Sequence, residues 1–419
     1  KILARERELN MTPVLPAFAG HVPAALKRIH PDANIQYLGK WAGFDDKYRC
    51  HFLNPEEPLF AKIQKSFLEE QEKMFGTDHI YGVDPFNEVD PPSWEPEYLA
   101  QVSSDMYKTL VAADPEAVWL QMTWMFYHDR DLWTVPRIKA LLTGVPQDKM
   151  MLLDYHCENV ELWQTTDKFH GQPYIWCYLG NFGGNTTLTG NVKESVKRLD
   201  NALQNGGDNL RGIGSTLEGL DVHQFPYECI FEKAWTIDRD ERSWVDCLAD
   251  RHVGAVSAPV REAWHILYDD IFVQVPRTLG ILPGYRPQMW NNHDRRTSNE
   301  YDNATLFRVW ELLLEEPSCH RDAYNIDLIT VGRQVMGNYF LEVKHDFDSL
   351  YRQRNIPELQ AKAAEMKEIL SDLETLTAFH MHASLDKWIE DARSLGATDE
   401  QKDYYEKNAR NLITTWGGS

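Results

Sequence analysis

Short apolar runs alternate with amphipathic segments through the first half of the chain. The runs lack a polar face, as expected for strands that are buried on both sides of a parallel sheet. They cover residues 12–18, 79–83, 117–122, 150–154, 173–179 and 210–216. The segments between them with apolar residues at helical spacing include 58–75, 97–113, 135–142 and 192–203. This pattern predicts strands that alternate with helices around a parallel α/β sheet.

The number of strands suggests a barrel that has lost its beginning. A closed (β/α)8 barrel of the TIM type needs eight strands, whereas this pattern supplies six. Residues 1–10 have the character of the end of a helix. We therefore expect a TIM-type barrel whose first two strands precede Lys1.

After about residue 225 the apolar period becomes helical and remains so. One stripe consists of Met366, Ile369, Leu370, Leu373 and Leu376, which we expect to be core. Thr398 and Gln401 have the spacing of a capping box, which predicts the start of a further helix. The expected fold class is α/β plus all-α: an N-terminally incomplete barrel domain over residues 1–225 and an all-α domain over residues 226–419, whose C-terminal completeness stays open.

The charge balance and the cysteines exclude several classes of function. Acidic residues outnumber basic ones by 64 to 43, a net charge of -21, which argues against nucleic acid or an anionic membrane surface as a partner. No apolar stretch approaches the length of a membrane span. The six cysteines form no C-x-x-C pair, and His380 and His382 fall on different faces of a helix. We therefore predict no metal site and no cofactor.

One polar loop follows the second apolar run. Residues 84–92 read D-P-F-N-E-V-D-P-P, and the two final prolines prevent the strand from continuing. Asn87 and Glu88 therefore lie where a strand gives way to a loop, the edge at which barrel enzymes carry their chemistry. A carboxyl there can protonate a glycosidic oxygen while the amide holds the substituent on the second carbon of the sugar. The alternative is a carboxylate that only caps the loop.

Glu218, in I-G-S-T-L-E-G-L, is the second candidate acid. It follows the last predicted strand, four strands after the one that precedes Glu88, and strands four apart face each other across an eight-stranded barrel. A glycosidase needs two such carboxyls, one to protonate the leaving oxygen and one to attack the anomeric carbon or activate water. The sequence does not provide their separation, so retention and inversion both stay open here. Taken alone, Glu218 would suit a loop salt bridge or a helix cap.

Four longer runs make the resemblance to a known family specific. They are M-T-P-V-L-P-A-F-A-G-H-V-P (residues 11–23), F-G-T-D-H-I-Y-G-V-D-P-F-N-E (75–88), A-V-W-L (117–120) and I-W-C-Y-L-G-N-F-G-G-N (175–185). They resemble the α-N-acetylglucosaminidases of glycoside hydrolase family 89, and the similarity covers most of the chain while weakening in the helical half. The resemblance implies a small N-terminal domain, a (β/α)8 barrel and an all-α domain, of which this chain would lack the first domain and the start of the barrel.

The resemblance also implies roles for both glutamates. Glu88 matches the general acid/base of the family, and Glu218 matches the catalytic nucleophile of its retaining mechanism. One departure concerns the residue before the nucleophile, which is Leu217 here and often proline in the family. The glutamate and the following glycine are both kept.

A set of further residues matches the pocket for N-acetylglucosamine (GlcNAc). It consists of Asn87, Trp41, Trp124 and Ile175, with Tyr155 at a position where the family varies. Asp154 and Glu158 would lie near the same edge of the barrel, where they could tune Glu88, bind sugar hydroxyls or make structural hydrogen bonds. Sequence alone leaves these alternatives open.

The expected function is that of an exo-α-N-acetylglucosaminidase. The resemblance implies retaining hydrolysis of terminal non-reducing α-linked GlcNAc from glycans such as heparan sulfate or mucin-type chains. A secreted, periplasmic or lysosomal location is expected, and assembly as a homo-oligomer, as in relatives, stays open. The alternatives are a catalytically silent sugar-binding barrel protein and a barrel glycosidase of different sugar specificity.

Overall fold

The computed structural model describes residues 1–41, 43–183, 186–219, 222–275, 300–316 and 319–414. The chain divides into two compact units. The first comprises Lys1–Leu179 and Lys197–Thr216, and the second comprises Gly180–Val196 and Leu217–Ser419. The second unit therefore takes in a short segment that lies within the first half of the sequence. The boundary after residue 225 stays a prediction.

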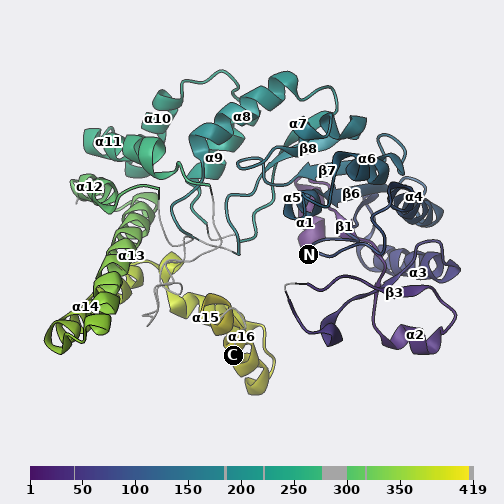
Figure 1. Ribbon diagram of the computed structural model, residues 1–419. Helices are drawn as coiled ribbons and strands as arrows, with labels where there is room; N and C mark the ends of the chain where they lie inside the picture. Colours follow the sequence, from purple (N-terminus) through teal and green to yellow (C-terminus); the bar gives the residue numbers. More distant parts are fainter. Residues whose placement is uncertain (42, 184–185, 220–221, 276–299, 317–318, 415–419) are drawn as a thin grey trace. The chain divides into compact units, whose positions relative to one another are not determined.

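The first unit is built on one six-stranded sheet (Figure 1). Its strands follow in the order β1 (Leu15–Pro16), β5 (Ile80–Gly82), β6 (Val118–Met122), β7 (Met150–Asp154), β8 (Tyr174–Tyr178) and β9 (Leu210–Ser215), and each neighbouring pair is parallel. Each apolar run of the sequence contains one of these strands, which confirms the predicted parallel sheet. In β8, Tyr174, Trp176, Cys177 and Tyr178 are fully buried, which explains the absence of a polar face.

Helices connect consecutive strands of the sheet (Figure 1). The longer ones are α3 (Pro58–Phe75), α4 (Pro96–Ala113), α6 (Val135–Thr143) and α8 (Val192–Asn205). Shorter elements are α1 (Ile2–Glu8), α2 (Ala25–Ile29), α5 (Trp124–His128), α7 (Leu162–Thr165) and the 3-10 turns η1 (Asp46–Tyr48) and η2 (Lys168–Gly171). Proline occupies the first turn of α3, α4 and α6, where its missing N–H would have had no partner within the helix.

A small antiparallel sheet in the first unit was not predicted. It consists of β2 (His21–Val22), β4 (His51–Leu53) and β3 (Ile35–Tyr37), in that order. Strands of two or three residues are too short to show an alternation of apolar and polar positions. The sequence pattern therefore indicates only a connection where β2, β3 and β4 lie. The sheet is nevertheless part of the core, because Phe52 and Leu53 are buried.

Beyond residue 221, the described part of the second unit consists of helices and loops, which confirms the predicted all-α half. Its elements are α9 (Phe225–Phe231), η3 (Glu232–Ala234), α10 (Glu241–Val253), α11 (Ala258–Ile266), the π-helical turn η4 (Leu267–Ile271), α12 (Asn303–Leu314), α13 (Asp322–Gln353), α14 (Ile356–Ala378), η6 (Met381–Ala383), α15 (Leu385–Ser394) and α16 (Asp399–Ile413). Thr398 and Gln401 form the predicted capping box at the start of α16.

The stripe predicted on α14 is narrower than expected. Met366, Ile369 and Leu373 are buried, and they pack against Phe340 and Val343 of α13. Leu370 is 44% exposed, so its assignment to the core was wrong. The stripe is narrow because this part of α14 buries its apolar side chains against one partner helix, and one such contact covers only a thin band of a helix surface.

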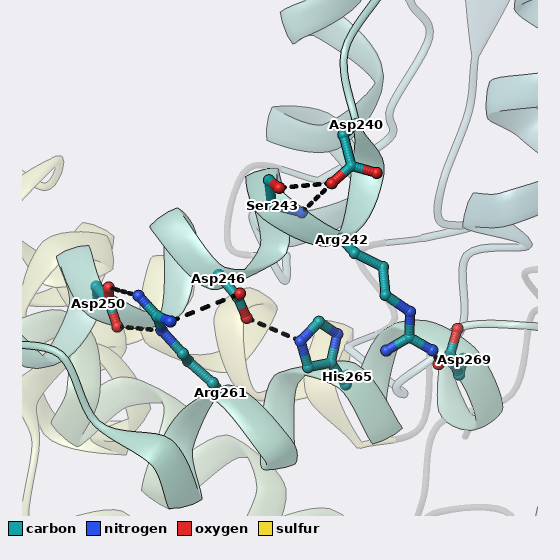
Figure 2. A network of polar contacts seen from close by, with 8 residues as sticks. All are labelled: Asp240, Arg242, Ser243, Asp246, Asp250, Arg261, His265 and Asp269. Atoms are coloured by element: carbon teal, nitrogen blue, oxygen red, sulfur yellow. Dashed lines mark hydrogen bonds and ion pairs between the residues drawn. The ribbon is translucent and has the colours of Figure 1, made fainter.

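Charged side chains join α10 to α11 (Figure 2). Arg261 of α11 lies between two carboxylates of α10: its Nε donates to Asp250 at 2.9 Å, and its Nη1 is 3.6 Å from Asp246. His265, one turn further along α11, contacts Asp246 at 2.8 Å. The Arg261 guanidinium holds the pKa of Asp250 below its usual value. Residues four apart on one helix thus meet residues four apart on the other, which sets the register of the two helices.

A close approach of α4 and α6 in the first unit can be tested at Gly144. A Cβ atom at this position would lie 2.1 Å from the Ser103 hydroxyl and 2.4 Å from the Ala100 carbonyl oxygen. Gly144→Ala must therefore push the two helices apart, and we expect it to lower the free energy of unfolding by roughly 1–3 kcal/mol. Urea denaturation followed by circular dichroism measures this change.

Gly212→Ala is the matched control, because a Cβ atom at this position of β9 meets nothing within 4 Å. Its free energy of unfolding should stay within roughly 0.5 kcal/mol of the unsubstituted protein. Equal stability of the two variants would contradict the packing of α4 on α6.

Candidate active site

The loop of residues 84–92 follows β5, and the small antiparallel sheet supports it. Phe86 is buried with its ring centroid 5.3 Å from that of Phe52 in β4. His21 Nε2 lies 3.0 Å from the carbonyl oxygen of Pro85. Burial lowers the pKa of His21, which favours a neutral imidazole that donates to this carbonyl. The small antiparallel sheet, which the sequence did not predict, therefore positions the loop of residues 84–92.

The parallel sheet fixes the start of the same loop. The Trp119 indole of β6 donates to the Val83 carbonyl at 2.8 Å, and the Val83 N–H donates to the Leu120 carbonyl at 3.2 Å. Glu88 itself has a φ of +53°, a left-handed conformation that non-glycine residues rarely adopt. Such a conformation persists only where the surroundings hold it.

Two tryptophans hold the carboxylate of Glu88. Trp41 Nε1 donates to Oε2 at 2.6 Å, and Trp124 Nε1 donates to Oε1 at 2.7 Å. Trp41 lies between β3 and β4, and its ring stacks on that of Phe44 with centroids 5.5 Å apart. Trp124 begins α5, just after β6. The structure thus brings three predicted site residues together, although the sequence assigned the tryptophans only to substrate binding.

Tyr155 lies beside Trp124, with ring centroids 5.5 Å apart. Its main chain is fixed from the ends of two other strands. The Tyr155 N–H donates to Thr123 Oγ1 at 3.0 Å, and Thr216 Oγ1 donates to the Tyr155 carbonyl at 2.7 Å. Loops after β6, β7 and β9 are therefore cross-linked next to the Glu88 cluster.

Ile175 and Asn87 stand apart from these contacts. Ile175 lies where the pairing of β8 with β9 is irregular, and it is only partly buried in an otherwise buried strand. A Cβ atom at Gly214 would lie 2.8 Å from Cγ2 of Ile175, so the glycine leaves room for the Ile175 side chain. Asn87 is exposed, and within the described residues its amide makes no hydrogen bond. Their assignment to a substrate pocket stays a prediction.

Glu218 belongs to the second unit, whereas Glu88 belongs to the first. It follows closely on the end of β9 at Ser215, as predicted for a carboxylate at the edge of the sheet. Its side chain is exposed, and Oε2 accepts a hydrogen bond from the Gly183 N–H at 2.5 Å. Gly183 has a φ of +58°, a conformation that glycine adopts at little cost.

Asp154 and Glu158 prove to be structural groups. Asp154 is fully buried and accepts the N–H groups of Leu162 and Trp163 at 3.2 and 3.1 Å. Burial raises its pKa to about 7. Glu158 is also fully buried, and it accepts the Leu179 N–H at 3.2 Å. Of the alternatives that the sequence left open, hydrogen bonding within the fold is the one seen.

Asp84 is a titrating group that sequence reasoning missed. It is half-buried, and Gln121 Nε2 donates to its Oδ1 at 3.2 Å. Desolvation raises its pKa to about 6, opposed by the Gln121 hydrogen bond, and the nearby charge of Glu88 raises it further. The only signal in the sequence was the position of Asp84 at the head of the loop, directly after an apolar strand.

The part of the chain that the structure describes holds no group of three or more His, Cys, Asp or Glu side chains suited to a metal ion. Among the helices of that same part, none is both long enough and apolar enough to cross a membrane.

Comparison with protein families gives two matches that cover nearly the whole chain. Residues 1–237 match the TIM-barrel domain of α-N-acetylglucosaminidase, and residues 244–419 match the C-terminal domain of the same family. The human α-N-acetylglucosaminidase is 35% identical over 427 residues, an alignment that covers 100% of this chain and 57% of the human protein. The chain therefore spans little more than half the length of this relative.

Solved structures of a family 89 glycoside hydrolase from Clostridium perfringens have the same fold. One, in complex with PUGNAc, superimposes with a TM-score of 0.88 at 25% identity and covers 100% of this chain and 48% of the other. Another, with two Glu→Gln substitutions and in complex with its substrate GlcNAc-α-1,4-galactose, gives a TM-score of 0.88 at 24% identity over the same shares. These matches confirm the predicted fold class, a TIM-type barrel joined to a helical domain.

The partly desolvated carboxyl of Asp84 should make stability depend on pH. Below its ordinary pKa of 3.8 the group is protonated in both the folded and unfolded states, and above about 6 the folded state bears the cost of a desolvated charge. Stability should therefore fall as pH rises through this window, by at most roughly 3 kcal/mol. Asp84→Asn removes that cost and can still accept the Gln121 hydrogen bond. We expect urea denaturation to show a gain over the unsubstituted protein at about pH 7.5 and none at about pH 3.5.

Asp90→Asn provides the control, because Asp90 lies in the same loop but is exposed. It should leave the difference in stability between the two pH values unchanged. The same gain for Asp84→Asn at both pH values would show that desolvation of the charge is not the cause.

Proposed function

This chain belongs to the α-N-acetylglucosaminidase family, glycoside hydrolase family 89, and from that premise we propose that the protein is an exo-acting glycosidase that releases terminal α-linked GlcNAc. The observation that carries the proposal is the state of Glu88. In a chain of this family, it lies beyond the carboxyl end of a parallel strand with one indole N–H on each carboxylate oxygen. Barrel enzymes use that edge for chemistry.

The proposed mechanism retains the configuration at the anomeric carbon. Glu218 attacks that carbon while Glu88 donates its proton to the leaving glycosidic oxygen. In the second step Glu88 takes a proton from water, and the water displaces Glu218 from the sugar. In this second step Glu88 must accept a proton from water, and an indole N–H holds each of its oxygens in place. The indoles of Trp41 and Trp124 would therefore orient the base for attack by water.

The Clostridium perfringens relative supports two glutamates in these roles. Its complex with intact GlcNAc-α-1,4-galactose was obtained with two Glu→Gln substitutions. An amide keeps the shape of a carboxyl but is far too weak an acid, base or nucleophile to replace it. A two-carboxylate mechanism explains why such a pair of changes preserves a substrate. The same complex favours α-linked GlcNAc as the sugar recognised here.

The proposed GlcNAc pocket also includes the other predicted binding residues. Asn87 precedes the acid in an exposed position, where its amide can bind the 2-acetamido group of GlcNAc. Tyr155 and Ile175 would line the same pocket from the edge of the sheet. Heparan sulfate ends and mucin-type glycans are the substrate classes that we propose, because both carry terminal α-linked GlcNAc. No metal or cofactor is needed for this chemistry.

Substitution of either glutamate tests the proposal directly. Glu218→Gln removes the nucleophile and should lower kcat for an aryl α-GlcNAc substrate on the order of a thousand-fold or more, with the fold intact. Glu88→Gln should spare the first step with a good leaving group, which needs little protonation, and slow the second step. Stopped-flow release of the aryl group would then show a burst with Glu88→Gln and none with Glu218→Gln.

Asp90→Asn, in the same loop as Glu88, should leave kcat and KM close to those of the unsubstituted protein. Binding of α-GlcNAc without release by the unsubstituted protein would contradict the proposed activity and favour a sugar-binding role. Release of a different sugar would contradict the proposed specificity.

The Trp124 N–H should matter independently of its ring. Trp124→Phe keeps an aromatic ring but removes the donor to Glu88 Oε1, a charge-assisted hydrogen bond worth roughly 1.5–3 kcal/mol. We expect kcat to fall about ten- to a hundred-fold, with KM changed much less. Trp94→Phe is the control, since Trp94 packs edge-on against Trp133 and makes no hydrogen bond to Glu88 among the described residues. Equal effects of the two substitutions would indicate a packing role only.

A further inference from the structure

The two carboxylate oxygens of Glu88 face different surroundings. Trp124, which donates to Oε1, is partly buried and packs against Tyr155 at the edge of the sheet, with ring centroids 5.5 Å apart. Trp41, which donates to Oε2, is 53% exposed and lies in the connection between β3 and β4. Glu88 therefore has an enclosed side at the sheet and an open side at Trp41.

Two further aromatic rings extend from Trp41. The Phe44 ring stacks on it with centroids 5.5 Å apart and planes 9° from parallel, and the Phe44 N–H donates to the Trp41 carbonyl at 3.0 Å. The Tyr48 ring meets that of Phe44 edge-on at 6.0 Å. Phe44 is 50% exposed and Tyr48 is 63% exposed. We call Trp41, Phe44 and Tyr48 the aromatic strip, and a contiguous exposed apolar patch of this kind indicates a binding surface.

Hydrogen bonds fix the backbone on which the aromatic strip is built. The Leu38 N–H donates to the Cys50 carbonyl at 3.0 Å, and Arg49 Nε donates to the Leu38 carbonyl at 2.9 Å. The Tyr48 N–H donates to the Asp45 carbonyl at 2.9 Å, at the turn η1. The strip is thus largely preformed, so it loses little conformational freedom when a ligand binds.

The contact with Glu88 determines which part of a substrate meets the aromatic strip. Glu88 protonates the oxygen that leaves, so the leaving group must approach its carboxyl. In an exo-acting enzyme the terminal GlcNAc enters the pocket, and the rest of the glycan extends into solvent. Because the open side of Glu88 is the side of Trp41, the rest of the glycan passes over the aromatic strip.

The chemistry of the aromatic strip suits a sugar ring. The apolar C–H face of a pyranose packs against the flat face of an aromatic ring, while its hydroxyls stay in water. Lys47 Nζ lies 4.8 Å from the centroid of the Tyr48 ring and covers one of its faces. A sugar would therefore stack on the opposite face of Tyr48.

We propose that the aromatic strip binds the sugar that is linked to the terminal GlcNAc, with Phe44 and Tyr48 as binding residues for this second sugar. The inference deepens the proposed function and rests on it, because it takes Glu88 as the acid that protonates the leaving oxygen.

Two substrates that differ only in the leaving group test the proposal. GlcNAc-α-1,4-galactose, the substrate of the Clostridium perfringens relative, carries a second sugar, whereas α-GlcNAc fluoride carries none. Tyr48→Ala should lower the ratio of kcat/KM for the disaccharide to kcat/KM for the fluoride about three- to ten-fold. Tyr48→Phe retains the ring and should keep this ratio within about two-fold. Phe44→Leu should lower the ratio as well and slow both substrates, because Phe44 also supports Trp41.

Phe75→Ala is the matched control. Phe75 is 47% exposed, but it ends α3 and precedes β5, which places it at the opposite edge of the parallel sheet from Glu88. It should leave the ratio at the value of the unsubstituted protein. An unchanged ratio in Tyr48→Ala, or an equal fall in Phe75→Ala, would overturn the proposal.

Binding without turnover separates this inference from the proposed activity. In the protein with Glu218→Gln, isothermal titration measures the Kd of GlcNAc-α-1,4-galactose and that of free GlcNAc. Addition of Tyr48→Ala should raise the Kd of the disaccharide about three- to ten-fold more than that of GlcNAc. An equal change for both ligands would overturn the proposal, because Tyr48 would then act on the GlcNAc pocket or on the fold.

The two failures look different. If the unsubstituted protein binds the disaccharide but releases no GlcNAc, the proposed activity fails, and the titration still decides whether the aromatic strip binds the second sugar. If the protein with Glu218→Gln does not bind the disaccharide, both the proposed function and this inference are overturned.

Discussion

The candidate chemistry depends on the parallel pairing of β5 with β6 and of each later strand with the next, because parallel strands all end at the same edge of their sheet. β5 is short, and its end is fixed mainly by its neighbour, through the Trp119 indole on the Val83 carbonyl. That bond determines where the loop of residues 84–92 begins. The loops after β6 and β7 begin at the same edge, which is why Trp124 and Tyr155 meet beside Glu88. Strand pairing therefore determines which loops meet at the candidate site, and a local motif alone would not.

How far the fold could be predicted follows from how each element is buried. Strands in a parallel sheet are largely covered on both faces, so β6, β7 and β8 left mostly apolar runs in the sequence. β2, β3 and β4 left none, because strands of two or three residues with His21, Gln36 and His51 in them resemble any loop. Leu370 was misplaced for a related reason: helical spacing shows that a helix has an apolar side, but the width of the buried stripe depends on how many partners it meets.

The sequence offered candidate site residues but not the contacts between them. The loop acid and the glutamate after β9 could be located because prolines and strand ends restrict where such residues can lie. Nothing in the sequence indicates that indoles from residues 41 and 124 donate to one carboxylate, since this requires three loops to converge. The raised pKa of Asp84 was missed for the same reason, because desolvation depends on what covers a group and not on its neighbours along the chain.

The two glutamates are held in ways that suit the different demands of the proposed reaction. Glu88 changes protonation state twice in each cycle, and side-chain donors such as the indoles of Trp41 and Trp124 can adjust as it does. Glu218 must attack one carbon atom along one line, which favours a donor that does not move. A main-chain N–H is such a donor, and the Gly183 N–H contacts Glu218 Oε2. On this reasoning the candidate nucleophile is held by a backbone donor of its own unit, whereas the candidate acid/base is held by side chains of the first unit.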